Sequence, residues 1–262
     1  NADDDLVYAM KEGLKCNIAY FSMDENNPRI KKHCKEGGYA AVFENGYITI
    51  MKGTWKIRVI KVSEVPVTYG GKALHNVMNC LPAVLSTYFW RNIEIEDIKL
   101  ALQTFVPSSA QTPGRLNMFQ FKQFKFLVDF AHNPAGLELL CDFVSKVDGE
   151  PKVGIISGTG DRRDEDIKEL GRISGRSFDE IIIRQDKHLR GRTAEEIVQL
   201  LVDGINETKT KDIPVTIILN EKEAIMHAYN TAKPGSLITI MCDVVAEALD
   251  LIKGLKEKED AE

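Results

Sequence analysis

The sequence lacks several features that would assign it to a common class of protein. No apolar run approaches the ~20 residues that a membrane-spanning helix needs, and a net charge of -5 provides no basic surface for nucleic acid. Cysteine is sparse and without C-x-x-C spacing, with five scattered residues: Cys16, Cys34, Cys80, Cys141 and Cys242. We therefore expect no membrane or nucleic-acid partner, and reduced, mostly buried cysteines in a cytoplasmic protein.

Several catalytic motifs are absent as well. The 262 residues contain no G-x-x-x-x-G-K-[ST] phosphate loop, no G-x-S-x-G elbow, no metal-ligand spacing and no G-x-G-x-x-G after a strand. A Rossmann dehydrogenase is therefore disfavoured, and we do not expect ATP chemistry from this chain alone. The opening Asn-Ala-Asp-Asp-Asp has neither an initiator Met nor a basic and apolar leader, so we expect the chain to begin inside a domain.

The composition is that of a soluble globular protein. With 44% hydrophobic and 28% charged residues, 262 positions suit one large or two ordinary domains. Residues 37–67 alternate short apolar runs with turns, and Asn45-Gly46 between two such runs is a strong hairpin signal. This segment predicts an antiparallel sheet. Helices are predicted at 75–90 and 94–104, the second with acidic residues in its first turn.

Beyond Pro113-Gly114 the pattern changes to strands that alternate with helices. Several strands are nearly continuous apolar runs, as expected of strands covered on both faces. The alternation predicts βαβ units in a mostly parallel α/β sheet, with residues 105–114 as a hinge and the final E-K-E-D-A-E as a solvated, frayed end. The predicted strands are 125–129, 152–157, 179–184, 214–219 and 236–242, and the predicted helices are 135–146, 164–177, 193–207, 221–230 and 243–254.

One apolar strand, F-L-V at 126–128, leads into a group of polar residues. Asp129, His132 and Asn133 follow it before a helix begins. Open α/β sheets bind ligands outside the carboxyl ends of their strands, and this trio suits the ribose and base of a nucleotide. The alternative is structural: Asp129 caps the following turn, and Asn133 starts the helix with Pro134 at its first position. Three polar residues within five positions favour a site.

The next strand ends in S-G-T-G-D-R-R-D. Gly158 and Gly160 permit positive φ and close backbone approach, and the following helix offers free N–H groups to an anion. Asp161 and Arg162 add charge. A flexible turn with a helix-capping acid explains the segment equally well.

Two further segments contain candidate binding residues. Asn76 and Asn79 are three positions apart, hence on one helix face, and could contact an adenine edge, with capping by Asn76 as the equal alternative. In I-I-I-R-Q-D-K-H-L-R-G-R, Asp186 could pair with a cationic substrate, while Arg190 and Arg192 could hold a carboxylate or phosphate. A solvated basic loop is the alternative for this segment.

Taken together, six segments resemble the Mur ligase superfamily, and most closely its cyanophycin synthetase branch. They occur in the order of the family and span nearly the whole chain. Phe130 stands where the family usually has Tyr, a departure that leaves the polar positions intact. The segments are N-A-D-D at 1–4, H-N-V-M-N at 75–79, T-P-G-R-L-N at 112–117, D-F-A-H-N-P at 129–134, G-T-G-D-R-R-D at 158–164 and L-R-G-R at 189–192.

The resemblance implies an α/β fold in two parts. Residues 1–111 would be the latter part of a central ATPase domain of the P-loop type, with a small antiparallel sheet. Residues 112–262 would be a C-terminal Rossmann-like domain with a mostly parallel sheet. The P-loop and the magnesium-binding acids of the family would precede N-A-D-D. We therefore expect ATP and Mg²⁺ as cofactors, with the metal ligands mostly outside this chain, and no activity from the chain alone.

The resemblance also implies roles for single residues. Arg115 would reach the ATP phosphates and serve catalysis, with Asn76 and Asn79 near the adenine. The ribose and base would lie against Asp129, His132 and Asn133. The residues bordering the incoming amino acid would be Asp161, Arg162, Asp186, Arg190 and Arg192, with Asp186 as the partner of a guanidinium.

The implied reaction is amide-bond formation through an acyl phosphate. It would add arginine to the β-carboxyl groups of an aspartate-containing polymer. The alternatives are a Mur or folylpolyglutamate type of ligase with another amino acid, and a non-catalytic module that binds nucleotide or substrate. The sequence leaves open whether the chain forms a homo-oligomer.

Overall fold

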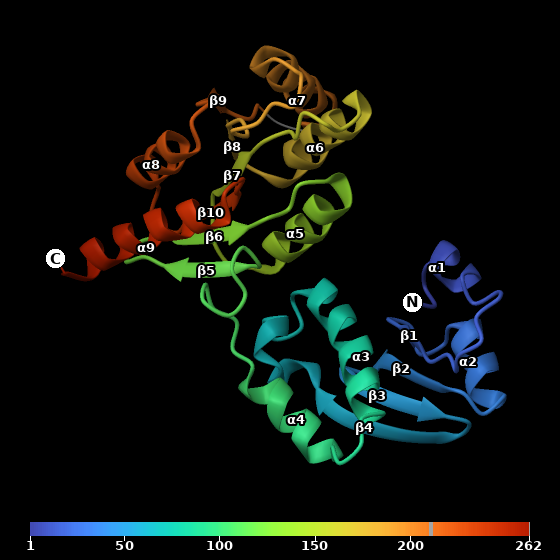
Figure 1. Cartoon of the computed structure of the whole chain (residues 1–262). Coiled ribbons are helices and arrows are strands. Elements are labelled where there is room, and N and C mark those ends of the chain that lie inside the picture. Colours follow the sequence, from blue (N-terminus) through green and yellow to red (C-terminus); the bar gives the residue numbers. More distant parts are fainter. Residues whose placement is uncertain (210–211, 262) are drawn as a thin grey trace. The chain divides into compact units, whose positions relative to one another are not determined.

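The computed structural model describes residues 1–209 and 212–261. The chain forms two compact units, Asn1–Val106 and Pro107–Glu262, and each is described here by itself (Figure 1). The first is called unit 1 and the second unit 2. Among the described residues, no helix combines the length and apolar character needed to cross a membrane.

Unit 1 contains a four-stranded sheet in the order β1-β2-β3-β4. The predicted antiparallel part is confirmed, and Asn45 and Gly46 turn between β2 and β3 with φ of 50° and 82°. A strand that was not predicted, β1, pairs in parallel with β2, so the sheet is mixed. The strands are β1 (Tyr20–Ser22), β2 (Tyr39–Glu44), β3 (Tyr47–Lys52) and β4 (Trp55–Lys61).

The helices of unit 1 pack on this sheet. Ile50 from β3 and Leu81 from α3 belong to the same buried cluster, because the apolar face of α3 lies against the sheet. Both predicted helices are confirmed, with small shifts at their ends. The elements are α1 (Asp5–Ala9), α2 (Pro28–Lys35), the short η1 (Val62–Glu64) and η2 (Pro66–Thr68), α3 (Leu74–Tyr88) and α4 (Ile95–Thr104).

Unit 2 contains a six-stranded sheet in the order β5-β6-β10-β7-β8-β9. Five strands are parallel, as predicted, and the edge strand β5 is antiparallel to β6. The sequence did not predict β5, which is short and only partly buried. The strands are β5 (Asn117–Gln120), β6 (Lys125–Asp129), β7 (Lys152–Ile156), β8 (Glu180–Ile183), β9 (Val215–Ile217) and β10 (Leu237–Met241).

Helices cover both faces of this sheet (Figure 1). One face carries α8 and α9, and the other carries α5 and α6, with α7 packed against α6. The predicted βαβ alternation is therefore confirmed, and it forms a doubly wound α/β layer structure. The helices are α5 (Pro134–Lys146), α6 (Asp164–Ser177), α7 (Ala194–Thr208), α8 (Glu221–Thr231) and α9 (Val245–Ala261).

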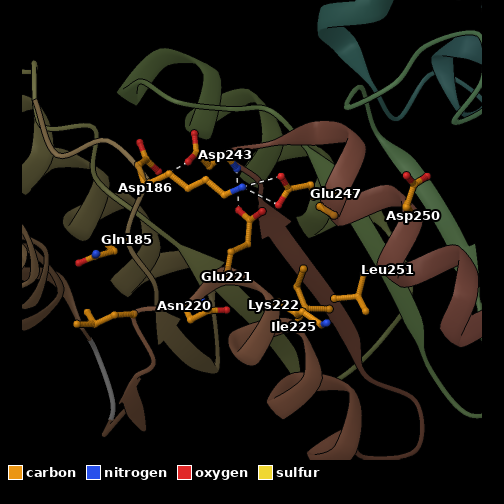
Figure 2. Close-up of a pocket in the computed structure, with 13 residues that line it drawn as sticks. Gln185, Asp186, Asn220, Glu221, Lys222, Ile225, Asp243, Glu247, Asp250 and Leu251 are labelled. Atoms are coloured by element: carbon orange, nitrogen blue, oxygen red, sulfur yellow. Dashed lines mark hydrogen bonds and ion pairs between the residues drawn. The ribbon is translucent and has the colours of Figure 1, made fainter.

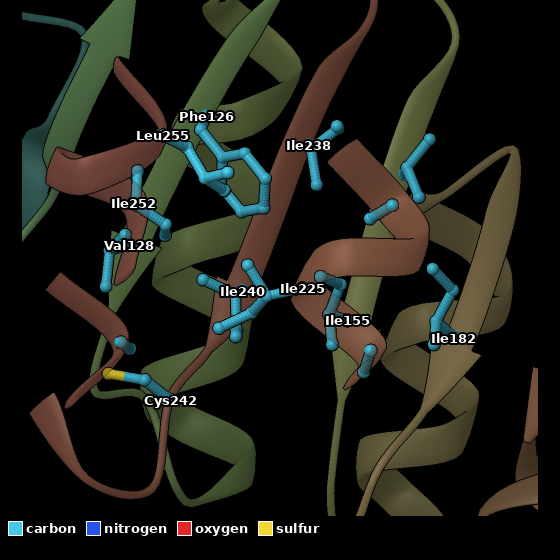
Figure 3. Packing of buried hydrophobic residues seen from close by; sticks show 14 of the residues in the cluster. Phe126, Val128, Ile155, Ile182, Ile225, Ile238, Ile240, Cys242, Ile252 and Leu255 are labelled. Atoms are coloured by element: carbon cyan, nitrogen blue, oxygen red, sulfur yellow. The ribbon is translucent and has the colours of Figure 1, made fainter. Parts of the chain in front are cut away.

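The core of unit 2 follows the two-residue period of its strands. Figure 3 shows Phe126 and Val128 of β6 beside Ile238 and Ile240 of β10, all facing α8 and α9. The intervening Leu127 is also fully buried, on the opposite face. Burial on both sides explains why these strands read as continuous apolar runs.

Two expectations about the ends and the cysteines can be compared with the structure. The expected tail is solvated, since residues 257, 258, 260 and 261 are exposed. It is not frayed, because α9 continues to Ala261 and Glu259 accepts a hydrogen bond from the Lys122 N–H at 3.0 Å; Glu262 lies outside the described residues. The expectation of mostly buried, unpaired cysteines is confirmed: Cys16 is exposed, and Cys34, Cys80, Cys141 and Cys242 are buried.

Candidate functional site

The carboxyl ends of four neighbouring strands in unit 2 meet around a small cavity. Because β6, β10, β7 and β8 are parallel and adjacent, the residues that follow them reach the same edge of the sheet. The cavity has a volume of about 180 Å³. Its lining consists of Phe130, Ala131, His132, Ser157, Thr159, Arg162, Arg184, Asp186, Arg190, Cys242 and Asp243.

Four of the predicted site residues therefore come together. His132, Arg162, Asp186 and Arg190 line this cavity, although up to 58 positions of sequence separate them. The other predicted residues of unit 2 do not line it. Arg115 is exposed, and the side chains of the rest have partners within the protein; these are Asp129, Asn133, Asp161 and Arg192.

Asp129 holds the preceding loop against the end of β6. Its Oδ2 accepts a hydrogen bond from the Leu116 N–H at 2.9 Å, and the backbone N–H groups of Phe130 and Ala131 also hydrogen-bond to its carboxylate. The structural alternative, that Asp129 caps the following turn, therefore agrees with the structure. Burial raises the pKa of the Asp129 carboxyl, and this effect is opposed by the Leu116 hydrogen bond and by the charge of Arg115.

The loop T-P-G-R-L-N is fixed by further hydrogen bonds. The Gly114 N–H donates to Asn117 Oδ1 at 2.7 Å, and the Gly114 carbonyl accepts from the Phe130 N–H at 2.9 Å. Gly114 has φ of 69°, a conformation that favours glycine. The loop leaves Arg115 exposed, with its guanidinium carbon 5.7 Å from the centre of the Phe130 ring. Arg115 is thus an exposed cation on a loop that is held by hydrogen bonds.

His132 and Asn133 differ in how their polar atoms are used. Asn133 is the N-cap of α5, because its Oδ1 accepts from the Gly136 N–H at 2.8 Å and Pro134 takes the first helical position. The structural alternative for Asn133 is therefore confirmed. The Nδ1 of His132 lies 3.0 Å from the Phe130 carbonyl oxygen. The half-buried ring can present its other nitrogen to a ligand.

The G-T-G-D turn and the L-R-G-R loop are bound to one another. Arg192 donates to the Gly160 carbonyl at 3.0 Å and to the Arg162 carbonyl at 2.8 Å, and Arg190 forms an ion pair with Asp161. The solvated basic loop is thus wrong for Arg192, which is half-buried. Neither Gly158 nor Gly160 has positive φ, so the glycines serve close approach instead. A Cβ at Gly160 would overlap the Leu189 carbonyl oxygen.

Arg184 is the residue that sequence reasoning missed. Its side chain is 1% exposed, and its guanidinium donates to Asp186 Oδ1 at 2.6 Å and to the Met241 carbonyl. Its Nε lies 3.2 Å from Glu221 Oε2. The available signal was an arginine directly after the buried strand E-I-I-I, where a charge needs internal partners. Arg184 therefore sets the position of Asp186.

In unit 1, Asn76 and Asn79 line a different cavity, of about 340 Å³, together with residues of η2, α3 and α4. Asn76 does not cap the helix, because the N-cap of α3 is Ala73. The alternative of capping by Asn76 is therefore wrong. The Asn76 Nδ2 instead donates to the Val67 carbonyl at 2.8 Å, and both amides lie on one face of α3 as predicted.

The comparisons with known proteins agree with this fold and its motifs. Residues 114–243 match the family model described as Mur ligase, glutamate ligase domain. The chain belongs to the Mur ligase superfamily, a class of ligases. The resemblance found in the sequence is thereby confirmed.

Within that class, several similar relatives are cyanophycin synthetases. The chain is 41% identical to the one from Nostoc sp. over 99% of its own residues, and 42% identical to the one from Crocosphaera subtropica over 96%. It spans 29% of the length of each. A solved structure titled E. coli FolC in complex with ADP has a TM-score of 0.59 and 16% identity, covering 84% of this chain and 47% of that one. This likeness concerns the fold.

Proposed function

We propose that the chain is part of an ATP-dependent carboxylate–amine ligase of the cyanophycin synthetase type. Residues 1–111 would supply part of the central ATPase domain, and residues 112–262 the C-terminal domain. The observation that carries the proposal is the cavity at the strand ends of unit 2, where His132, Arg162, Asp186 and Arg190 meet.

In this class of reaction, a substrate carboxylate is phosphorylated by ATP, and an amine then attacks the acyl phosphate, forming the amide and releasing phosphate. Catalysis depends mostly on positioning and on stabilising phosphoryl charge. Arg115 would supply a cation to the phosphates from its exposed position beside Phe130. Asn76 and Asn79 would contact the adenine. His132 and Phe130 would lie against the ribose and base.

The incoming amine would be an amino acid, and we propose arginine. Arg162 lines the cavity and Arg190 is oriented by Asp161, so both could hold an amino-acid carboxylate by charge-assisted hydrogen bonds. Asp186, held by Arg184, would offer a carboxylate to the cationic part. The acceptor would be the β-carboxyl group of an aspartate-containing polymer.

The fit to a metal ion can be judged on the described residues. In residues 1–209 and 212–261, no three His, Cys, Asp or Glu side chains are grouped so that they could hold a metal ion. We therefore assign no Mg²⁺ ligand and no metal-dependent step to them. ATP suits the described residues better than a metal ion does, because exposed and half-buried arginines lie at the site.

A second candidate is a non-catalytic module that binds nucleotide or substrate. It is favoured by the absence of a G-x-x-x-x-G-K-[ST] phosphate loop from the 262 residues. Calorimetry of the chain with ATP and Mg²⁺, together with a phosphate-release assay containing arginine and an aspartate polymer, tests both ideas. Binding with turnover supports the ligase, and binding without turnover supports the module. The absence of binding counts against both.

The proposed role of Arg115 has a matched test. Arg115→Ala should weaken ATP binding roughly tenfold, the scale of one lost charge-assisted contact. The free energy of unfolding should not change, because the side chain is exposed. Arg91→Ala removes another exposed arginine, in unit 1, and serves as the control. Equal affinities in the two variants would contradict the role.

A further inference from the structure

The edge strand β9 of unit 2 has one side without a neighbouring strand. Among the residues that the structure describes, β9 pairs with β8 alone and is the last strand of the sheet. The Ile218 N–H donates to the Ile183 carbonyl of β8 at 2.9 Å. Because the peptide groups of successive residues alternate in direction, the N–H and C=O groups of Val215 and Ile217 point away from β8. These groups can pair with a further strand.

The side chains of β9 form an exposed apolar row along the same edge. Val215, Ile217 and Leu219 alternate along the chain, and they are 37%, 53% and 40% exposed. Alternate residues of a strand share one face. The stretch I-P-V-T-I-I-L at 213–219 contains no charged residue. Apolar side chains thus lie beside unpaired backbone groups, a combination that favours the addition of a strand.

Two other edge strands of the molecule do not combine these features. β4, at the edge of the sheet in unit 1, carries Lys56, Arg58 and Lys61, and charges of this kind oppose the addition of a strand. β5, at the opposite edge of the sheet in unit 2, has its apolar Met118 and Phe119 half-buried. The exposed apolar row is therefore specific to β9, and does not follow from an edge position alone.

We propose that β9 pairs with β9 of a second copy of the chain, antiparallel about a twofold axis at Ile217. In this register Ile217 meets Ile217, and Val215 of each copy meets Leu219 of the other, so every exposed apolar residue of the row is covered. Because the backbone groups of Ile217 point outward, the two copies of this residue would exchange two N–H···O hydrogen bonds. The same patch serves both copies, and the interface closes with two.

The charges at the two ends of the uncharged stretch favour a second copy in this orientation. The exposed Asp212 precedes the stretch, and the exposed Lys222 follows it. Both lie five positions from Ile217, so antiparallel pairing brings Asp212 of each copy toward Lys222 of the other. Parallel pairing would instead bring like charges together, which is destabilising. The ends of β9 are therefore complementary to themselves in the antiparallel orientation.

The acid next to Lys222 does not oppose this pairing. Figure 2 shows the carboxylate of Glu221 directed toward Asp243 and Glu247, within unit 2. Its Oε2 accepts from the Asp243 N–H at 2.7 Å and lies 3.2 Å from the Nε of the buried Arg184. The charge of Glu221 is thus compensated inside its own copy, and Lys222 is the first exposed charge after β9.

Small-angle X-ray scattering of the 262-residue chain over a concentration series tests the proposal. We expect the mass to rise toward that of a dimer as the concentration approaches about 1 mM, because a short strand pair buries little surface and binds weakly. Ile217→Lys places two like charges opposite each other and should weaken the dimer roughly tenfold or more. Leu100→Lys, at a 59% exposed residue of α4, is the control and should leave the dimer unchanged.

Two further measurements locate the interface and its orientation. Asp212→Lys should weaken the dimer roughly threefold, the scale of one exposed ion pair, and combining it with Lys222→Asp should restore the dimer. The exchange of the Val215 and Ile217 amide protons should slow as the concentration rises. The Thr216 amide, which faces β8, should exchange slowly at every concentration.

Val215→Lys provides a second disruption of the same edge, and the unfolding curve of each variant shows whether it is folded. We expect unchanged unfolding for Ile217→Lys, because the residue is 53% exposed. A wild type that stays monomeric up to about 1 mM, whether or not another protein binds this edge, would overturn the proposal. So would a dimer that survives both lysine variants, growth beyond a dimer, or no restoration by the exchanged charges. None of these outcomes depends on the proposed ligase activity.

Discussion

Asp129 carries a charge that its buried position makes costly. Burial raises the pKa of its carboxyl above the usual unfolded value of about 3.9. The folded state therefore binds this proton more tightly than the unfolded state does. The contribution of Asp129 to the free energy of unfolding is greatest below the unfolded pKa, and falls as the pH rises toward and through the raised native pKa.

The direction of this pKa shift leads to a prediction for Asp129→Asn. The variant keeps an acceptor for the Leu116 N–H but does not titrate. We expect the variant to gain stability relative to the wild type as the pH rises from about 3 to 7. Urea unfolding at a series of pH values measures the difference. Asp142→Asn, at a half-exposed site on α5, is the control. If the wild type instead becomes more stable relative to Asp129→Asn as the pH rises, the hydrogen bond from Leu116 outweighs the effect of burial on the pKa of Asp129.

Any side chain at position 160 would clash with backbone atoms. Because a Cβ there would overlap the Leu189 carbonyl oxygen, Gly160→Ala should push apart the two loops that carry Arg162 and Arg190. We expect a loss of about 1–3 kcal/mol in the free energy of unfolding, the usual cost of overpacking.

Gly254→Ala provides the matched comparison for this prediction. Gly254 lies within α9 with nothing near its Cβ position, so alanine should stabilise the helix by about 0.5–1 kcal/mol. Thermal or urea unfolding of both variants makes the comparison. The same effect in both would contradict a specific role of close packing at Gly160.

At the scale of elements, the start of α5 depends on the side chain of Asn133. Asn133→Ala removes the acceptor for the Gly136 N–H and should cost about 1 kcal/mol of stability. Asn133→Asp keeps an N-cap oxygen and should retain stability. If Asn133 also contacts nucleotide through its amide, Asn133→Asp will weaken ATP binding while the unfolding curve stays unchanged. Equal stability of Asn133→Ala and the wild type would contradict the capping role.

At the scale of the whole molecule, each unit has its own buried clusters. The cluster around Phe126 and Ile240 draws only on unit 2, and the one around Ile50 and Leu81 only on unit 1. Phe105 and Val106, at the boundary, are 41% and 57% exposed. We expect limited proteolysis to cut near residues 105–112, and a chain of residues 107–262 to keep a folded spectrum with dispersed amide signals. An unfolded spectrum would show that unit 2 needs unit 1.

Much of this architecture could be predicted from local patterns. Each parallel strand of unit 2 carries its own apolar run, each helix has its own period, and Asn45-Gly46 is a turn signal. The strand β5 could not be predicted, because a short, partly buried edge strand has no clear period. The parallel pairing of β1 with β2 depends on contacts across 20 positions of sequence.

The sequence by itself determined the class of fold, the hairpin, the motifs of the Mur ligase superfamily and the strand ends where polar residues gather. These depend on the order of residues over short distances. Only the tertiary structure decided what the polar residues do. Asp129 and Asn133 accept hydrogen bonds from the backbone, and Arg184 is buried against Asp186 and Glu221. The reason is that burial and charge pairing depend on which strand ends become neighbours, and the sheet order places β10 between β6 and β7 although it comes last in the chain.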